Sequence, residues 1–382
     1  MNKYYFYMKT CKNYAQPSNI LHRLTLVIAA IIAISGAGCS KPDSVMEIYV
    51  LFPETGFASY LAPVRSGMEM AADDLEARGQ LKNRELRLLF ADSKSDPHTA
   101  KKKLTEFLKN GDPDVIIPVL SSVSLETGPV SLQEEIPMVA LVATNPEVPR
   151  QNRYTYSYYQ SATDEIRALE PMVNYPEVKS LAVIHQDDAY GQAIYHQAGE
   201  TFSGKGIRVL SAPYPAATQD ISNQVLLAGN SDAILIAGFE AGCIAALEEI
   251  RNQNFPGLIL GTSTMSTEIF LEMEEAQGII VASPSVYNPG YSLVKDLKLR
   301  YEEEFNQEFH HNAAAGYDVI TMLGSLAEEL DKVSPENILR LLEQEFVFPG
   351  LFGDVYKSRG QRSFNLPLVP VQFREGERIF LQ

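Results

Sequence analysis

Two apolar runs that end in hydroxyl side chains most constrain how this chain folds. Residues 115–120 (VIIPVL) and 138–142 (MVALV) are rich in β-branched side chains, which is typical of buried parallel strands. Ser121 and Ser122 follow the first run, Thr144 follows the second, and a polar segment of helical length separates the runs. The order strand, helix, strand predicts that both hydroxyl-bearing loops lie at the carboxyl ends of parallel strands. Small ligands bind at that edge of open α/β sheets, although the same hydroxyls are equally suited to cap helices.

The same alternation of strand and helix patterns fills most of the chain. It appears in two blocks, residues 46–148 and residues 178–282, which are followed by helical patterns and a strand- and turn-rich tail at 353–382. Each block is long enough to form its own sheet with covering helices. We therefore expect an α/β fold with two lobes and a cleft between the loops at their strand ends.

Composition excludes several classes of protein. The chain has 382 residues, is 45% hydrophobic and carries a formal net charge of −16, which argues against nucleic acid as a partner. The three cysteines, Cys11, Cys39 and Cys243, offer no disulfide framework. Cys243 lies in an apolar helical pattern, where a lone cysteine is most often a small core residue.

The N-terminal segment has the pattern of a secretory signal. Basic residues precede an apolar run at 24–34, which is followed by small residues and Cys39. The Ser-Gly-Ala-Gly-Cys sequence resembles the lipobox of bacterial lipoproteins, although Gly36 departs from it where an apolar residue is preferred. We expect residues 1–38 to be removed, Cys39 to be lipidated and residues 39–45 to form a tether. Ser40 favours the outer membrane under the sorting rule of enteric bacteria.

A set of motifs in fixed order carries a family resemblance. The motifs are FPETGFASY (52–60), ADSKSDPHTAKKKLTEFL (91–108), IPMVALVATNPEV (136–148), LAVIHQDDAYGQAI (181–194), DAILIAGFEAG (232–242), AAAGYDV (313–319) and FREGE (373–377). Their order and spacing resemble the type 1 periplasmic binding protein superfamily, specifically the branched-chain amino-acid (Leu/Ile/Val-type) substrate-binding proteins of ABC importers. The resemblance covers residues 46–382.

The resemblance implies two Rossmann-like lobes with parallel sheets joined by a three-crossover hinge. Lobe 1 would comprise residues 46–162 and 286–365. Lobe 2 would comprise residues 163–285 and 366–382.

The resemblance also implies the lobe 1 half of a ligand site. Ser121 and Ser122 would meet the carboxylate of an amino-acid ligand. The backbone of Val142 and the hydroxyl of Thr144 would meet its ammonium, and Tyr60 would flank its side chain.

Lobe 2 would close on the ligand with Tyr190 and Phe239. The family places an acid near the end of a later strand of this lobe, but residues 261–264 (GTST) hold none, so Ser263 is the candidate there. Glu240 is a candidate for the missing charge, although a solvated loop position suits it as well. Without that charge, the ligand class extends from amino acids to amides and small carboxylates.

None of the other sequence motifs indicates a cofactor site, a metal site or an enzyme. His310 and His311 have no acid or Cys at ligand spacing and are expected at a solvated helix boundary. We expect Asp187 and Asp188 to cap the next helix rather than to act as a general acid and base. No G-x-S-x-G motif, the signature of one class of hydrolases, occurs.

We therefore expect an extracytoplasmic solute-binding lipoprotein, anchored at the periplasmic face of the cell envelope, that captures a small polar ligand by hinge closure. Its expected partners are the small-molecule ligand, an ABC transporter permease and, through the lipid, a membrane; it is expected to be a monomer. The alternative is a regulatory or sensory lipoprotein that uses the same fold to control a partner in the envelope.

Overall fold

The computed structural model describes residues 45–82, 84–173, 177–216, 220–288, 292–364 and 366–381. The expected signal segment, Cys39 and the tether up to residue 44 lie outside the described residues. None of the described helices is long and apolar enough to span a membrane.

The first sheet is built from the N-terminal block of alternating elements. Its strands pair in parallel in the order β2-β1-β3-β4-β5. They are β1 (Val45–Phe52), β2 (Glu85–Asp92), β3 (Val115–Pro118), β4 (Met138–Ala140) and β5 (Thr155–Ser157). The strand order reverses between β1 and β3, and ligands bind beyond the carboxyl ends of strands at such a point.

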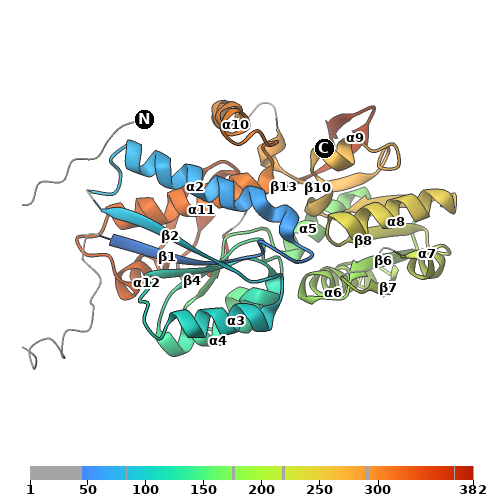
Figure 1. Ribbon diagram of the computed structural model, residues 1–382. Coiled ribbons are helices and arrows are strands. Elements are labelled where there is room, and N and C mark those ends of the chain that lie inside the picture. The colour runs from blue at the N-terminus through green and yellow to red at the C-terminus, as the bar shows by residue number, and fades with distance from the viewer. Residues whose placement is uncertain are drawn as a thin grey trace, which may run out of the picture. The chain divides into compact units, whose positions relative to one another are not determined.

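Helices cover both faces of this sheet (Figure 1). Helices α3 (Pro97–Phe107) and α4 (Ser121–Glu134) lie on one face, and α2 (Ala62–Ala77) packs with α11 (His311–Glu328) on the other. The remaining C-terminal elements of this lobe are α10 (Ser292–Phe305), α12 (Pro335–Leu342) and the hairpin of β11 (Phe346–Gly350) and β12 (Gly353–Lys357).

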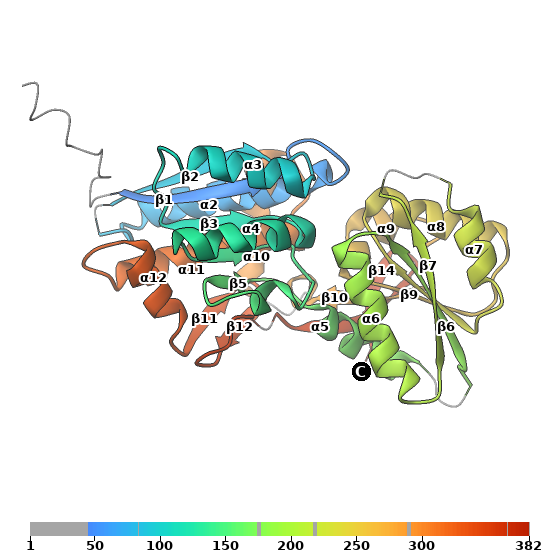
Figure 2. The ribbon, with the colours of Figure 1, turned by 90° about the horizontal axis from the view of Figure 1, so that it is seen from below.

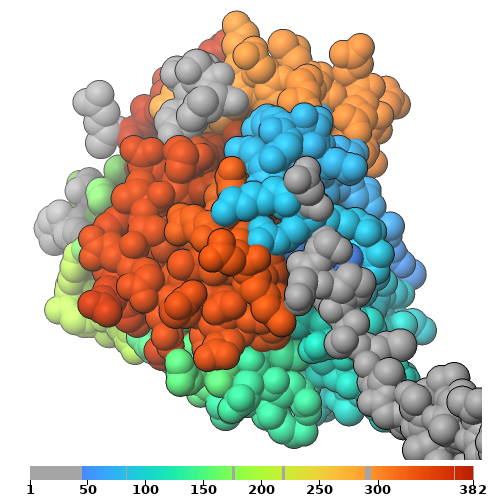
Figure 3. Space-filling view, turned by 90° about the vertical axis from the view of Figure 1, so that its left-hand side faces the viewer, coloured from blue at the N-terminus to red at the C-terminus, as the bar shows by residue number. Residues whose placement is uncertain are grey.

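Residues far apart in the chain are joined at one end of this lobe. Arg84 donates hydrogen bonds to the carbonyl oxygens of Ala327 (3.0 Å), Leu330 (2.6 Å) and Asp331 (2.8 Å). Ala327 lies in the last turn of α11, and Leu330 and Asp331 lie just beyond the end of the helix. Figure 3 shows the residues near 80 beside the C-terminal helices on this face.

The second sheet has the order β14-β13-β10-β9-β8-β6-β7. Its strands are β6 (Ser180–Gln186), β7 (Arg208–Tyr214), β8 (Ala233–Ala237), β9 (Leu258–Gly261), β10 (Ile280–Pro284), β13 (Leu368–Arg374) and β14 (Glu377–Phe380). The strands from β7 to β10 pair in parallel, whereas β13 joins β10 antiparallel and β14 joins β13 antiparallel. The strand-rich tail therefore completes the second sheet at its edge.

Alternate residues of the central strands face opposite layers of helices. Leu181 and Val183 belong to a core that includes α5 (Ala162–Leu169) and α6 (Ala189–Ser203). Ala182 and Ile184 belong to a second core with three other helices, which Figure 2 shows away from α6. They are α7 (Ser222–Ala228), α8 (Glu240–Asn252) and α9 (Glu268–Glu272). Continuous apolar strands covered on both faces are typical of parallel sheets.

Over the described residues, the chain passes between the two lobes three times, after β5, after β10 and after β12. The two-lobed α/β fold with three crossovers is thus confirmed. The lobe boundaries at 162/163, 285/286 and 365/366 stay predictions.

Three local features differ from the sequence expectations. The tyrosine-rich segment 149–163 contributes β5 to the first sheet, a strand that the sequence pattern did not predict. Helix α9 was not predicted, because five residues are too few to show helical periodicity. His311 is fully buried at the start of α11, so the expected solvated boundary is wrong there.

Candidate functional site

Two strained backbone positions mark the carboxyl ends of β3 and β4. Leu120 has a φ of 88° and Val142 a φ of 49°, a region that branched side chains rarely adopt. Such conformations persist only where the surrounding structure enforces them, and they cluster at functional sites. The two loops predicted to contact a ligand therefore begin at these positions.

Three hydroxyl side chains follow strands β3 and β4, and they differ in their contacts. Ser121 is 2% exposed, and its hydroxyl accepts a hydrogen bond from the backbone N–H of Asn145 (3.2 Å). It therefore holds the neighbouring loop in place. Ser122 is half-buried and Thr144 is buried, and within the described part of the chain neither side chain has a recorded hydrogen bond. No described residue occupies these two hydroxyls, and their contact with a ligand stays a prediction.

An aromatic cluster joins the loops of the two sheets. The ring of Phe239, which follows β8, lies 5.4 Å from Phe57 and 6.0 Å from Tyr60, both in the loop after β1. The same ring lies 5.4 Å from Tyr190 at the start of α6. The structure thus brings together Tyr60, Tyr190 and Phe239, and it adds Phe57, which sequence reasoning did not single out.

A polar contact connects the same two sets of loops. The side-chain amide of Asn145 donates a hydrogen bond to the carbonyl oxygen of Ala189 (2.8 Å). Asn145 follows β4 in the first sheet, whereas Ala189 is the first residue of α6 beyond β6. Loops at the carboxyl edges of both sheets are therefore in direct contact.

Asp188 acts as a helix cap at this site. Its carboxylate accepts hydrogen bonds from the backbone N–H groups of Tyr190 (3.0 Å) and Gly191 (2.9 Å). The capping role expected for this strand-end acid is therefore confirmed. The Tyr190 hydroxyl in turn donates to Thr262 Oγ1 (2.8 Å), and burial raises the pKa of Tyr190 well above its usual value.

Glu165 is a buried acid that sequence reasoning missed. Its carboxylate accepts hydrogen bonds from the backbone N–H of Ser263 (2.9 Å) and from the Ser263 hydroxyl (2.5 Å). Burial raises the pKa of Glu165 to about 8, although both hydrogen bonds from Ser263 act in the opposite direction. The loop after β9, which holds no acid of its own, therefore receives one from α5.

A pattern in the sequence could have revealed Glu165. Ser161 and Asp164 form a capping box that starts α5. Counting from that start, Ala162, Glu165 and Leu169 share the helix face that is buried. An acid on an otherwise apolar helix face therefore indicates a buried carboxyl group.

Glu240, the candidate for the missing charge, begins α8 and is partly buried, which raises the pKa of its carboxyl. Its charge also raises the pKa of Tyr60, after the larger effect of burial. It therefore lies near the aromatic cluster, but the acid bonded to the predicted loop is Glu165.

The described residues contain no group of three or more His, Cys, Asp or Glu placed to hold a metal ion. His310 caps α11 by accepting a hydrogen bond from the Asn312 N–H (3.2 Å), and the backbone N–H of His311 donates to the Tyr287 hydroxyl (3.2 Å). The histidine pair therefore has a structural role.

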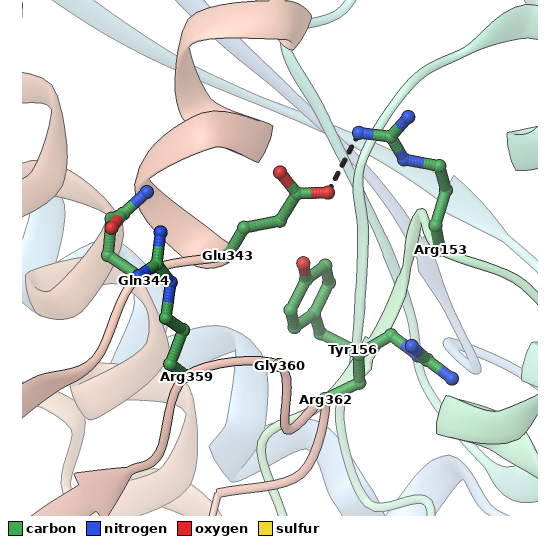
Figure 4. A pocket seen from close by; sticks show the side chains of 7 residues that line it. All are labelled: Arg153, Tyr156, Glu343, Gln344, Arg359, Gly360 and Arg362. Carbon is green, nitrogen blue, oxygen red and sulfur yellow. Dashed lines mark hydrogen bonds and ion pairs between the residues drawn. The ribbon is translucent and has the colours of Figure 1, made fainter.

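A surface cavity of about 270 Å³ lies apart from these loops. Its lining includes Arg153, Tyr156, Glu343, Arg359 and Arg362, and Arg153 pairs with Glu343 at 2.8 Å (Figure 4). None of the residues predicted to contact a ligand lines this cavity, which holds an exposed ion pair.

Two α/β lobes whose strand-end loops meet through aromatic rings and an amide hydrogen bond are the arrangement expected of a solute-binding protein. Comparison with known proteins gives the family. Residues 47–378 match the family described as Periplasmic binding protein, and the chain belongs to it. The members of this family are binding proteins, so the chain is a binding protein and not an enzyme.

The chain is similar to curated proteins of the Leu/Ile/Val-binding type. It is 21% identical to Leu/Ile/Val-binding protein homolog 2 of Brucella abortus over 366 residues, covering 92% of this chain and 95% of that protein. It is 23% identical to Leu/Ile/Val-binding protein homolog 3 of Brucella melitensis over 291 residues, covering 72% of this chain and 77% of that protein. The family places such proteins outside the cytoplasm.

Solved structures share the fold at low identity. The leucine-binding protein LivK of Thermotoga maritima has a TM-score of 0.77 at 21% identity, covering 88% of this chain and 98% of that one. LivJ of Streptococcus pneumoniae has a TM-score of 0.76 at 18% identity, covering 88% of this chain and 99% of that one. LivJ is a branched-chain amino acid transporter substrate-binding protein whose structure was solved in complex with isoleucine.

Proposed function

We propose that the protein captures a small polar solute, an amino acid, an amide or a small carboxylate, between its lobes and delivers it to an ABC importer. The observation that carries the proposal is the contact of Phe239 with Phe57, Tyr60 and Tyr190. Loops from both sheets meet at these rings, so a solute held beside them would touch both.

The solute would contact the loops of lobe 1 first and those of lobe 2 second. Ser122, Thr144 and the backbone at Val142 would receive the polar end of the solute on lobe 1. Tyr190 and Phe239 would then reach it by rotation about the three crossovers. Some contacts form only in the closed state, so the closed protein would bind the solute more tightly than the open protein. Binding would therefore stabilise the closed state.

The related proteins support the amino-acid part of this class. The curated relatives are named for Leu/Ile/Val binding, and the LivJ structure was solved with isoleucine. The aromatic cluster suits an apolar ligand side chain, since aromatic rings supply a large apolar contact area. Lipidation at Cys39 would keep the protein beside its permease at the periplasmic face of the envelope.

A thermal-shift screen of the mature protein tests the proposal. The probes are amino acids, their amides and small carboxylic acids. A true ligand at 100 times its Kd adds roughly 2.7 kcal/mol to the free energy of unfolding, so the Tm rises measurably. Absence of any shift across the screen, together with recovery of an envelope protein in a pull-down, would favour the regulatory or sensory alternative.

A further inference from the structure

The surface cavity of about 270 Å³ beside β5 has a charge opposite to that of the chain. Among the described residues that line it, Arg153, Arg359 and Arg362 are positive and Glu343 is the one acid. The lining therefore carries two more positive than negative charges, whereas the whole chain has 48 acidic and 32 basic residues. A hollow with a surplus of positive charge attracts anions.

Two of the three guanidinium groups have no carboxylate partner. Arg359 is exposed and has no recorded hydrogen bond or ion pair within the described chain. Arg362 is half-buried, and its Nε donates to the carbonyl oxygen of Pro149 (2.6 Å), which leaves its terminal N–H groups without a recorded acceptor. Arg153 pairs with Glu343 at 2.8 Å, but both side chains are exposed to water, and such pairs contribute little stability. All three arginines are therefore available to an anion.

Tyr156 adds a hydroxyl donor to the same cavity. The residue is 1% exposed and lines the cavity, and its hydroxyl has no recorded hydrogen bond to any described residue. Burial and then the charge of Glu343 raise the pKa of Tyr156 to about 12, against the effect of Arg362 and Arg153, so the hydroxyl keeps its proton. In the view of Figure 4 the ring lies between Arg359 and Arg362. A buried donor without an acceptor costs free energy that an anion in the cavity would recover.

The loop 358–362, which carries two of the arginines, is held by its own hydrogen bonds. Lys357 is 0% exposed, and its Nζ donates to the carbonyl oxygens of Ser358 (3.1 Å) and Gln361 (3.2 Å). The backbone N–H of Gln361 closes a turn onto the Ser358 carbonyl (3.1 Å), and Gly360 has a φ of 79°, which suits glycine. The loop is therefore formed before a ligand binds, which lowers the cost of binding.

We propose that this cavity is a second binding site, separate from the proposed solute site, and that it takes a phosphate or a phosphate monoester. Guanidinium groups form paired hydrogen bonds with phosphate oxygens, and the tyrosine hydroxyl can donate to a further oxygen. A phosphate monoester carries about 1.5 to 2 negative charges at pH 7, which matches the surplus charge of the lining. A single carboxylate has one charge and matches it less well.

A phosphate bound here would contact segments that lead into two of the three crossovers. Tyr156 lies in β5, which precedes the first crossover, and Arg362 follows β12, which precedes the third. Glu343 follows α12 in the same lobe. The ligand would therefore connect parts of lobe 1 that are distant in the sequence. Because it binds only the folded protein, it should also raise the Tm.

Isothermal titration calorimetry of the mature protein tests the site. The probes are inorganic phosphate and methyl phosphate, and acetate is the singly charged comparison. Both phosphates should bind at least about tenfold more tightly than acetate and should raise the Tm. Failure of both phosphates to bind, or equal affinity for acetate, would overturn the proposal.

Three single substitutions test whether the phosphate binds in this cavity. Arg359→Gln should lose about 10- to 100-fold in affinity for phosphate, and Tyr156→Phe, which keeps the buried ring, about 3- to 10-fold. Arg374→Gln removes the same charge from an exposed position of β13 and should bind as the wild type does. Arg359 is exposed and has no recorded partner among the described residues, so its variant should fold. Wild-type affinity in both cavity variants would mean that phosphate binds elsewhere and would overturn the proposal.

A vesicle experiment distinguishes the source of the phosphate group, since a free solute and a phosphatidic acid headgroup present the same group. The Cys39→Ser protein is sedimented with phosphatidylcholine vesicles that contain phosphatidic acid, so that no lipid anchor contributes. Once phosphate binding is established, sedimentation that methyl phosphate prevents supports the site with a lipid headgroup as its ligand. Absence of sedimentation supports the site with a free phosphate or phosphate ester as its ligand.

Discussion

Gly67 of α2 and Gly316 of α11 face each other's helix backbone at the crossing of the two helices. A Cβ atom added to Gly67 would overlap the carbonyl oxygen of Ala313, and one added to Gly316 would overlap the carbonyl oxygen of Val64. The missing side chains therefore allow close approach. This crossing joins the N-terminal block to the C-terminal helices and so fixes the first lobe.

Gly67→Ala should lower the free energy of unfolding by about 1–3 kcal/mol, because overpacking at a tight contact forces the backbones apart. Gly199→Ala in α6 is the matched control, since a Cβ there meets nothing within 4 Å. Alanine has the higher helix propensity, so the control should be neutral or stabilised by up to about 1 kcal/mol. Urea unfolding measures both variants, and equal stabilities would contradict the close-packed crossing.

Ser122→Ala combined with Thr144→Ala should abolish solute binding while the fold survives. These hydroxyls have no recorded hydrogen bond within the described residues, so their loss leaves no buried partner unsatisfied. The Tm without ligand should therefore change little, and the thermal shift with the identified solute should disappear.

Ser124→Ala is the control for this pair of substitutions. The Ser124 hydroxyl of α4 donates to the carbonyl oxygen of Leu120 (2.7 Å), the residue that precedes this helix. Its removal should cost about 1 kcal/mol of stability and leave affinity unchanged. Binding by the double variant with wild-type affinity would show that the lobe 1 site is elsewhere.

Asp318 should make the protein less stable as the pH rises toward neutrality. This buried carboxyl accepts hydrogen bonds from the Leu351 N–H (2.9 Å) and the Tyr158 hydroxyl (3.1 Å), yet burial raises its pKa to about 7. Below about pH 4 the carboxyl is protonated in both folded and unfolded chains. Between about pH 4 and pH 7 it ionises only in the unfolded chain, so its stabilising contribution falls with rising pH.

Asp318→Asn should remove this part of the pH dependence, which amounts to at most about 1.4 kcal/mol per pH unit. Urea unfolding at pH 5, 6 and 7 gives the slope. Asp112→Asn, at an exposed position, should keep the wild-type slope. Identical slopes in all three proteins would mean that Asp318 is ionised in the folded state.

The sequence revealed the parts of the site that depend on local pattern. The strand ends at Leu120 and Val142 and the cap at Asp188 follow from short runs of residues. Glu165 does not, because its contact with Ser263 joins residues 98 positions apart in the chain. The family places an acid near residues 261–264, which hold none, and tertiary packing brings one to this loop from another helix. The β5 strand was missed for a related reason, since a three-residue strand is defined by its partner and not by its own periodicity.

Cys39→Ser should release the full-length protein from the membrane. If a diacylglycerol is attached at this thiol, its acyl chains hold the chain at a bilayer, since two chains give stable anchoring where one gives only reversible binding. In cells fed labelled palmitate, the wild-type protein should carry label and enter the detergent phase of a Triton X-114 partition. The serine variant should carry none and remain in the aqueous phase. Cys11→Ser is the control, because Cys11 lies within the segment expected to be removed, and it should behave as the wild type does. Label in Cys39→Ser, or wild-type protein in the aqueous phase, would contradict lipidation at this residue.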